Sequence, residues 1–198
     1  MSAVDGGGTS APQPALLSIN IAPQDTPSTP PLCIEKLHQF SIEEDAIVRS
    51  DVGKVRTNVK NPRIFFYPEN AQSHFDIDSQ SGLISTKMEL DHETNPRFLL
   101  NIGVEDDVSG MTGYCQVLVN IIDINDNAPS FGPTLGLITI PENSPAHTLV
   151  FAKQARDRDS GENGRVNYRI IKDTGVFTVD ENTGVVTTLQ ELDYEQVR

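Results

Sequence analysis

Residues 123–127 are the part of this sequence best suited to holding a hard cation. They read Asp-Ile-Asn-Asp-Asn and are followed by Ala128 and Pro129. So many acid and amide groups are unusual for a strand and crowded for a simple turn. Calcium prefers about six to eight oxygen ligands from carboxylates, amides and backbone carbonyls. An extended segment points alternate groups to opposite sides, so this string could serve ions above and below it. The plainer interpretation is an ordinary polar linker.

The charge balance is acidic. The 198-residue chain has 28 Asp and Glu against 15 Lys and Arg, which gives a formal net charge of −13. Such a surface repels a phosphate backbone, so we expect no nucleic-acid partner and no electrostatic attachment to a membrane surface. Acidic chains can simply be well solvated, so the spacing of the carboxylates must decide whether they bind a cation.

The sequence carries no targeting or membrane-spanning signal that we can identify. It has no apolar run of the length that a transmembrane helix needs. Residues Met1–Ser10 lack both the basic and the apolar regions of a signal peptide. We therefore expect neither a signal peptide nor a transmembrane helix within this chain.

Two ordered matches reveal an internal repeat. Leu90-Asp-His-Glu93 recurs as Leu192-Asp-Tyr-Glu195, so Asp91 and Asp193 lie 102 residues apart. Ile42-Glu-Glu-Asp45 resembles Ile140-Pro-Glu-Asn143 at an offset of 98 residues. Matches at nearly one period indicate a tandem module of about 100 residues.

The module has the pattern of an all-β fold. Val, Ile, Thr and Phe fill short alternating runs, and Gly, Pro, Asn and Asp separate them, as is typical of the strands of a sandwich. The predicted strands are Arg63–Tyr67, Leu83–Met88, Phe98–Val104, Gln116–Ile122, Val166–Ile171 and Val185–Leu189. Gly82 and Gly184 are predicted to end tight hairpin turns, because glycine readily adopts a positive φ.

These features together resemble the cadherin superfamily, and within it the non-classical protocadherin and Fat-like members. The strings that carry the resemblance are Asp123–Asn127, the Leu-Asp-x-Glu pair, Glu142 in Pro-Glu-Asn, and Asp157-Arg-Asp159 with Glu162-Asn-Gly164. The resemblance implies tandem seven-stranded Greek-key β-sandwiches, with a complete repeat over residues 33–126 and an incomplete, truncated one over 127–198. Residues 1–32 repeat the layout of the end of the complete repeat and are predicted to be the tail of a preceding repeat plus a linker. A disordered tail is the alternative.

The resemblance also implies a set of calcium ligands at the seam between the repeats, where the family holds three ions. The implied ligands are Glu44, Asp91, Glu93, Asp123, Asn125, Asp126, Asp157 and Asp159, with the backbone carbonyls of Ile124, Asn127 and Asn163. Carboxylates ~4 Å apart repel by ~4 kcal/mol per pair at an effective dielectric constant of about 20. Calcium would therefore turn a self-repelling hinge into a rigid connection.

The other ends of the repeats depart from this pattern. The upstream segment Ala22–Pro27 is not an Asp-x-Asn-Asp-Asn string, and Thr57–Ile64 lacks an Asp-x-Asp. Only Asp106 matches a ligand there, so we expect a calcium-free or weakened upstream junction. Three further acids, Glu142, Asp193 and Glu195, are expected to serve a downstream junction.

The function that the resemblance implies is calcium-dependent cell–cell adhesion or recognition, with another cadherin ectodomain as a homophilic or heterophilic partner. The parent protein would be anchored in the plasma membrane with this part outside the cell. A secreted calcium-using carbohydrate-binding sandwich is the alternative, although the chain has no Trp and only four Tyr. We expect no enzyme, because no group of residues has the spacing of an active site, and we expect His92 to be merely exposed.

The two cysteines, Cys33 and Cys115, leave two possibilities open. In a cadherin-like sandwich the first and last strands are neighbours, so these residues could meet although they are 82 residues apart. An extracellular setting permits a disulfide. Two separate thiols are the alternative, because free cysteine is common as a small core residue.

Overall fold

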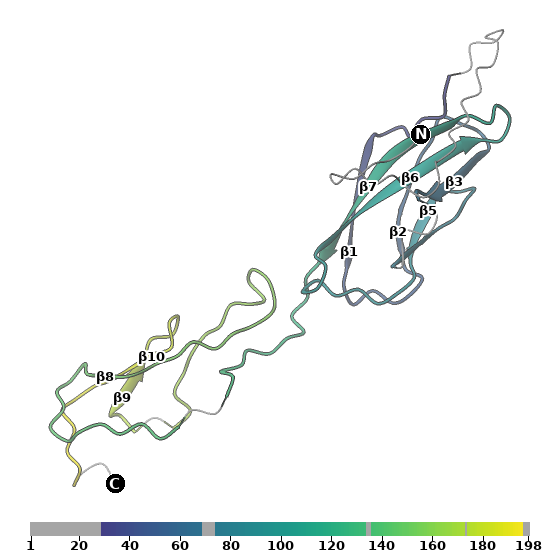
Figure 1. Cartoon of the computed structure of the whole chain (residues 1–198). Coiled ribbons are helices and arrows are strands. Elements are labelled where there is room, and N and C mark those ends of the chain that lie inside the picture. The colour runs from purple at the N-terminus through teal and green to yellow at the C-terminus, as the bar shows by residue number, and fades with distance from the viewer. Residues whose placement is uncertain (1–28, 69–73, 134–135, 173, 196–198) are drawn as a thin grey trace, which may run out of the picture. The chain divides into compact units, whose positions relative to one another are not determined.

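A computed structural model describes residues 29–68, 74–133, 136–172 and 174–195. The chain divides into two compact units, Met1–Pro30 and Pro31–Arg198. The first lies almost wholly outside the described residues, and with it the predicted tail of a preceding repeat. All ten regular elements in the described part of the chain are β-strands, which confirms the all-β prediction (Figure 1).

The first seven strands form a two-layered sandwich. A four-stranded sheet has the order β1-β7-β6-β3, and a three-stranded sheet has the order β2-β5-β4. Strand β1 runs parallel to β7, and the other neighbours are antiparallel. The strands are β1 (Leu37–Glu43), β2 (Asp51–Lys54), β3 (Pro62–Phe66), β4 (Phe75–Ile77), β5 (Leu83–Thr86), β6 (Arg97–Asp106) and β7 (Thr112–Ile122). This order confirms the predicted seven-stranded Greek-key sandwich.

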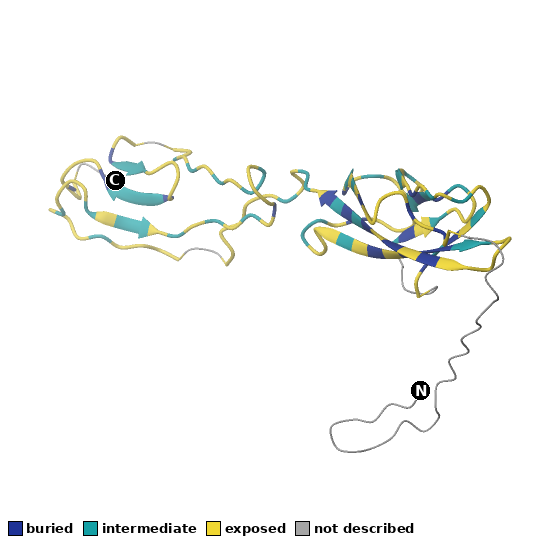
Figure 2. Ribbon diagram, turned by 90° about the horizontal axis from the view of Figure 1, so that it is seen from above, coloured by how far each residue is buried: buried dark blue, intermediate teal, exposed yellow. Residues whose placement is uncertain are grey.

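Alternation of buried and exposed residues, clearest along β7, builds the core between the two sheets. In β7, Cys115, Val117, Val119 and Ile121 are buried while most of their neighbours are partly or fully exposed. The dark and light bands along the strands in Figure 2 show this alternation. Burial of one such side chain stabilises the fold by roughly 1.5–3 kcal/mol. Because the alternation has a period of two, it fixes which face of each strand meets the opposite sheet.

Two tight turns have the glycines that the sequence predicted. Gly82 has a φ of 72° and leads into β5, and Gly184 has a φ of 68° in the corresponding turn of the second repeat. In each turn an aspartate accepts a backbone hydrogen bond from the residue three positions ahead: Asp78 from Ser81 at 2.7 Å and Asp180 from Thr183 at 2.8 Å. Hydrogen bonds from the hydroxyl groups of Ser81 and Thr183, together with these backbone bonds, lower the pKa of both carboxyl groups.

The second repeat has three strands in one sheet, in the order β8-β10-β9. They are β8 (Leu149–Ala152), β9 (Phe177–Val179) and β10 (Val185–Thr188). The predicted strand Val166–Ile171 is wrong, since these residues have no ladder partner. Its counterpart β3 pairs with β6, which starts at Arg97. The residues 102 positions after β6 lie beyond Arg198, the last residue of this sequence.

The structure pairs Cys33 with Cys115 in a disulfide. Their Cα atoms are 6.0 Å apart, within the range that a disulfide requires. The bond attaches the segment before β1 to the start of β7 and closes a separation of 82 residues. Of the two possibilities that the sequence left open, the structure supports the disulfide.

Candidate metal centre

One buried carboxylate joins three segments at the end of the first sandwich from which the acid-rich linker leaves. Glu44 comes directly after β1 and is 6% exposed. Its Oε1 accepts a hydrogen bond of 2.8 Å from the backbone N–H of Ile124, and its Oε2 accepts one of 2.7 Å from that of His92. Glu44 thus fixes the acid-rich linker and the Leu-Asp-His-Glu turn relative to each other.

Carboxylates converge on this point in two overlapping groups. Oxygens of Glu44, Glu93 and Asp126 lie within 4.8 Å of one another, and so do oxygens of Glu93, Asp123 and Asp159. Glu93 belongs to both groups. Its Oε1 is buried and has no hydrogen-bond partner among the described residues. A buried, unpaired carboxylate oxygen is costly unless a cation or a donor meets it.

The electrostatics of the two groups also favour a cation. Burial raises the pKa of Glu93, and a hydrogen bond with Asp123 and repulsion from Glu44 add to the shift. Burial likewise raises the pKa of Asp126, together with repulsion from Glu44 and Asp159. Both shifts mean that ionisation is unfavourable while the acids face only one another.

The second repeat supplies one acid and one amide that reach the same place. Asp159 is 8% exposed, and its Oδ1 accepts a 2.7 Å hydrogen bond from Nδ2 of Asn127 in the linker. Asn163 Nδ2 donates a 2.7 Å hydrogen bond to Asp123 Oδ2. Burial opposes ionisation of Asp123, but this bond and one from the Ser160 backbone lower its pKa overall.

Not every residue of the predicted ligand set enters these groups. Asp91 accepts hydrogen bonds from Thr94, at 3.0 Å from its backbone N and 2.7 Å from its hydroxyl. Asp157 accepts one of 3.0 Å from the backbone of Asp159. Both therefore support their own turns in this conformation. The carbonyl of Ile124 accepts from the backbone of Asp126 at 2.9 Å, and the intervening Asn125 is exposed.

His92 has a role that the sequence did not reveal. Its Nδ1 lies 2.8 Å from the carbonyl oxygen of Ile121, and its Nε2 lies 3.1 Å from the hydroxyl of Ser160 in the second repeat. A carbonyl can only accept, so Nδ1 carries a proton, while the Ser160 hydroxyl can either donate to Nε2 or accept from it. The expectation of a merely exposed imidazole is wrong. The repeat gave no signal, because Tyr194 occupies the matching position.

The acids predicted for the other junctions lie apart from this centre. Asp106 caps its own turn, accepting from the Ser109 hydroxyl at 2.7 Å. Asp193 accepts from the backbone of Glu195 at 2.9 Å, and Glu142 is exposed. Within the described ranges, neither set forms a group of three close carboxylates. The upstream segment Ala22–Pro27 lies outside the described residues.

The donor set fits calcium well. The two groups present hard carboxylate oxygens, and carbonyl and amide oxygens lie on the same linker, as calcium requires. A further group, Cys33 with His38 and Cys115, is no metal site because both sulfur atoms are in the disulfide.

A family model of the cadherin domain matches residues 38–122 and 137–198. The chain belongs to the cadherin family. The protein dachsous of Drosophila melanogaster is 31% identical over 203 residues, covering 98% of this chain and 6% of that protein. Protocadherin Fat 4 of Homo sapiens is 38% identical over 128 residues, covering 64% of this chain and 3% of that protein.

Solved cadherin structures have the same architecture. Repeats EC22–24 of mouse cadherin-23 match with a TM-score of 0.73 at 25% identity, covering 84% of this chain and 56% of that one. The predicted likeness to protocadherin and Fat-like cadherins is thus confirmed. These relatives are cadherins rather than enzymes. Within the described part of the chain, we find no helix with the length and apolar character needed to cross a bilayer.

Proposed function

We propose that this chain is part of a cadherin ectodomain for calcium-dependent cell–cell adhesion or recognition, and that calcium makes its interrepeat junction rigid. The observation that supports this most is Glu93, whose carboxylate belongs to both groups of converging acids and has one buried oxygen, Oε1, without a hydrogen-bond partner among the described residues. The domain limits proposed with it are a complete repeat at 33–126 and an incomplete repeat at 127–198.

The proposed ligands come from three parts of the chain. Glu44, Glu93 and Asp126 would hold one ion, and Glu93, Asp123 and Asp159 would hold a second. Asp91, Asp157, Asn125 and the carbonyls of Ile124, Asn127 and Asn163 complete the set that the family resemblance implies. Asp91 and Asp157 would have to turn from their local hydrogen bonds to bind.

The residues themselves explain why the junction would depend on the ion. Bound calcium would supply positive charge between the carboxylates. Without it, pairs of ionised acids ~4 Å apart repel by ~4 kcal/mol at an effective dielectric constant of about 20. Glu44 holds the linker on one side, and Asp159 and Asn163 hold it on the other. Because bound calcium would neutralise the acids, the hydrogen bonds on both sides of the linker could then form at the same time.

We propose a second cadherin ectodomain as the partner and an anchored parent protein on the outer side of the plasma membrane. One solved relative is described as a protocadherin γB7 cis-dimer, and another relative is named as a seven-pass G-type receptor. The chain covers 7% or less of each relative named by sequence comparison. The partner and the anchor therefore belong to the proposal.

Titration calorimetry and small-angle scattering test the proposal together. Calcium added to the whole chain should release or absorb heat, and the distribution of interrepeat angles should broaden when a chelator is added. Magnesium serves as the control ion, because it demands a smaller octahedral site and gives up its water reluctantly. Absence of calcium heat at millimolar concentration would disprove the metal centre.

A further inference from the structure

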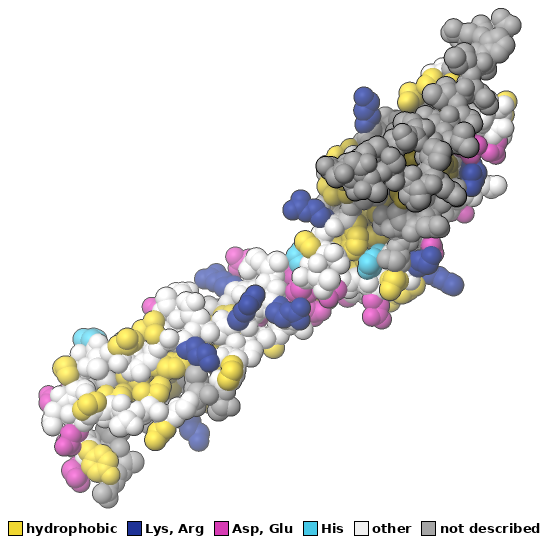
Figure 3. Space-filling model, in the orientation of Figure 1, with side chains coloured by type: hydrophobic (Ala, Val, Ile, Leu, Met, Phe, Trp, Pro, Cys, Tyr) yellow, Lys and Arg dark blue, Asp and Glu magenta, His cyan; other side chains and the backbone are white. Residues whose placement is uncertain are grey.

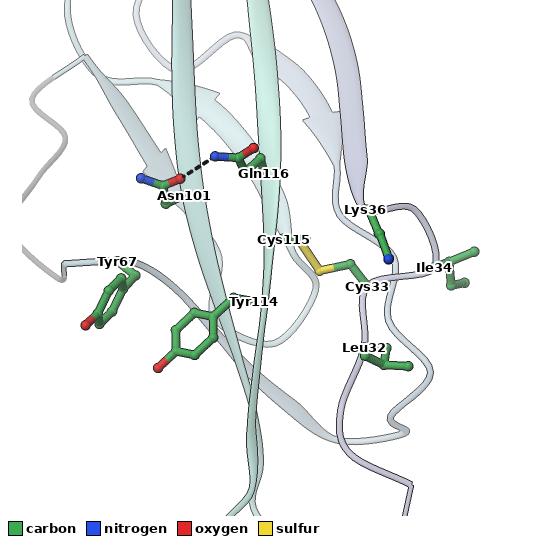
Figure 4. Close-up of a pocket in the computed structure, with 9 residues that line it drawn as sticks. All are labelled: Leu32, Cys33, Ile34, Lys36, Tyr67, Asn101, Tyr114, Cys115 and Gln116. Carbon is green, nitrogen blue, oxygen red and sulfur yellow. Dashed lines mark hydrogen bonds between the residues drawn. A yellow bond between two sulfur atoms is a disulfide. The ribbon is translucent and has the colours of Figure 1, made fainter.

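A pocket of about 790 Å³ lies around the disulfide of the first repeat near the start of β7, whereas the acidic linker follows the end of β7 (Figure 4). Its walls are the segment before β1, the middle of β6 and the start of β7. The volume falls within the ~300–1,000 Å³ typical of small-molecule sites. The pocket therefore has room for a ligand of one to a few rings.

Two tyrosines stand next to each other on one side of the pocket. The rings of Tyr67 and Tyr114 have centroids 5.0 Å apart and are inclined at 61°. Tyr67 is 51% exposed and Tyr114 is 59% exposed. Figure 4 shows both side chains extending to the same side of the strands. Half-exposed rings of this kind offer an apolar face next to a polar hydroxyl group.

Both rings are carried on paired backbone. Tyr114 lies opposite Gly103 in the β6–β7 ladder, and the backbone N–H of Tyr67 donates to the carbonyl of Asn101 at 2.9 Å. The backbone that carries the two rings is thus held in place before any ligand arrives. Sites built on strands hold their geometry better than sites built on loops.

An amide pair provides a donor at one end and an acceptor at the other (Figure 4). Asn101 and Gln116 face each other across β6 and β7, and Gln116 Nε2 donates to Asn101 Oδ1 at 3.0 Å. The bond leaves the Asn101 amino group and the Gln116 carbonyl to face a ligand. If both amides were reversed, one donor and one acceptor would still remain. A ligand with several hydroxyl groups, of which one accepts and another donates, matches this pair.

The charge of the pocket differs from that of the chain. Lys36 is the one charged side chain in its lining, and no carboxylate is among the described residues that form its walls. The whole chain carries −13. An ammonium group in a lining without carboxylates favours a ligand with one negative charge over a neutral or positive one.

The wall opposite the tyrosines is fixed covalently. The Cys33–Cys115 disulfide joins the segment before β1 to β7 beside the pocket. Two residues before Cys33, Pro31 approaches Gly113 so closely that a Cβ on the glycine would collide with the Pro31 carbonyl oxygen. The pocket is therefore bounded by parts of the chain that cannot separate easily.

We propose that this pocket binds the terminal pyranose ring of a carboxylate-bearing saccharide. Tyr67 and Tyr114 would contact the apolar C–H face of the ring, the amides of Asn101 and Gln116 would bind two of its hydroxyl groups, and Lys36 would pair with the carboxylate. The site lies on one repeat and uses no metal ligand, so its binding is independent of calcium.

A saccharide fits better than a proline-rich peptide, the other ligand that aromatic grooves commonly accept. Proline has no backbone N–H, so such a peptide presents mainly carbonyl acceptors. It would leave the Gln116 carbonyl facing an apolar ring without a donor, and an unpaired polar group costs binding energy. A sugar ring with hydroxyl groups satisfies both amides.

Saturation-transfer NMR on the whole chain tests the proposal, with 3′-sialyllactose as the acidic probe and lactose as the neutral one. We expect saturation of the sialic acid ring in excess chelator as well as in calcium. Tyr114→Ala should weaken binding by about tenfold or more, because it removes the exposed ring. Lys36→Gln should reduce the preference for sialyllactose over lactose to about unity, because it removes the one charge.

Leu99→Ala is the matched control. Leu99 lies on β6 two residues before Asn101, is 53% exposed and does not line the pocket, so its loss should leave binding unchanged. The proposal is overturned if neither probe shows saturation transfer at several millimolar, or if Tyr114→Ala binds like the wild type. It is also overturned if the Tyr67 and Tyr114 signals shift with protein concentration and not with sugar, because the pocket would then be a contact between copies of this chain.

Discussion

Asn163 and Asp123 are joined side chain to side chain, with Asn163 Nδ2 2.7 Å from Asp123 Oδ2 across 40 residues of sequence. The bond attaches a loop of the second repeat to the acidic linker. The family resemblance implied a different use of Asn163, as a calcium ligand through its backbone carbonyl. The two uses involve different atoms, so a single substitution separates them.

Asn163→Ala should remove the side-chain bond and leave the carbonyl in place. We expect calcium affinity to change by less than about threefold, since a backbone ligand survives the substitution. In chelator, the amide of Ser160, which donates to Asp123 at 3.2 Å, should exchange faster because Asp123 loses a neighbouring anchor. Calorimetry and hydrogen exchange measure the two effects. Asn167→Ala, at an exposed position of the same repeat, is the control. A tenfold loss of affinity in Asn163→Ala would mean that the side-chain oxygen itself binds calcium.

Glu44→Gln and Glu43→Gln make a matched pair, because the residues are adjacent and each substitution removes one negative charge. Glu44 is buried among the converging acids, whereas Glu43 is exposed. We expect Glu44→Gln to weaken calcium binding by about tenfold, or ~1.4 kcal/mol, and Glu43→Gln to change it by less than about twofold. Calorimetric titration of both variants measures their calcium affinities. Equal losses of affinity would show that binding depends on the net charge of the chain and not on the position of Glu44.

The sequence was sufficient for the features that depend on local strings. The acid-rich linker, the hairpin glycines and the alternation of β7 can be recognised within a few residues. The strand order could also be predicted, because the motifs of the internal repeat indicated the cadherin family and that family has a defined topology. The proximity of Glu44 and Glu93 was predicted from that resemblance and not from their spacing in the sequence alone.

Other features depend on contacts that no local pattern encodes. Val166–Ile171 has the alternation of a strand, yet a strand forms only where a neighbour completes its ladder. The bonds of Asp91 to Thr94 and of His92 to Ser160 depend on side-chain geometry at short range. The pocket joins residues from positions 32 to 116, which only the folded sandwich brings together.

Gly82→Ala and Gly110→Ala should differ in stability although both glycines have a left-handed backbone. Their φ angles are 72° and 65°. A Cβ on Gly82 would lie 2.5 Å from the Val55 carbonyl oxygen and 2.9 Å from the Ile64 side chain, whereas nothing lies within 4 Å of one on Gly110. Gly110→Ala should cost about 1–2 kcal/mol from backbone strain alone. Gly82→Ala should cost about 1–3 kcal/mol more, because the core must shift. Chemical denaturation of both variants measures the difference, and equal costs would mean that the turn yields without strain in the core.

Cys33→Ser combined with Cys115→Ser should destabilise the first repeat and leave the metal centre intact. The disulfide closes a separation of 82 residues, and the chain-entropy model gives ~4 kcal/mol for a loop of that length. Cys115 lies near the start of β7, while the acids follow its end at Ile122, which at ~3.4 Å per residue places them about 20–25 Å away. We therefore expect a lower denaturation midpoint with calcium affinity within about twofold of the wild type, since separate sites act additively.

The double substitution avoids leaving one reactive thiol, and wild-type protein treated with a reductant should show the same shift. An unchanged midpoint in both samples would show that the bond does not constrain the unfolded chain. A large loss of calcium affinity would instead show that the disulfide and the acidic linker are coupled through β7.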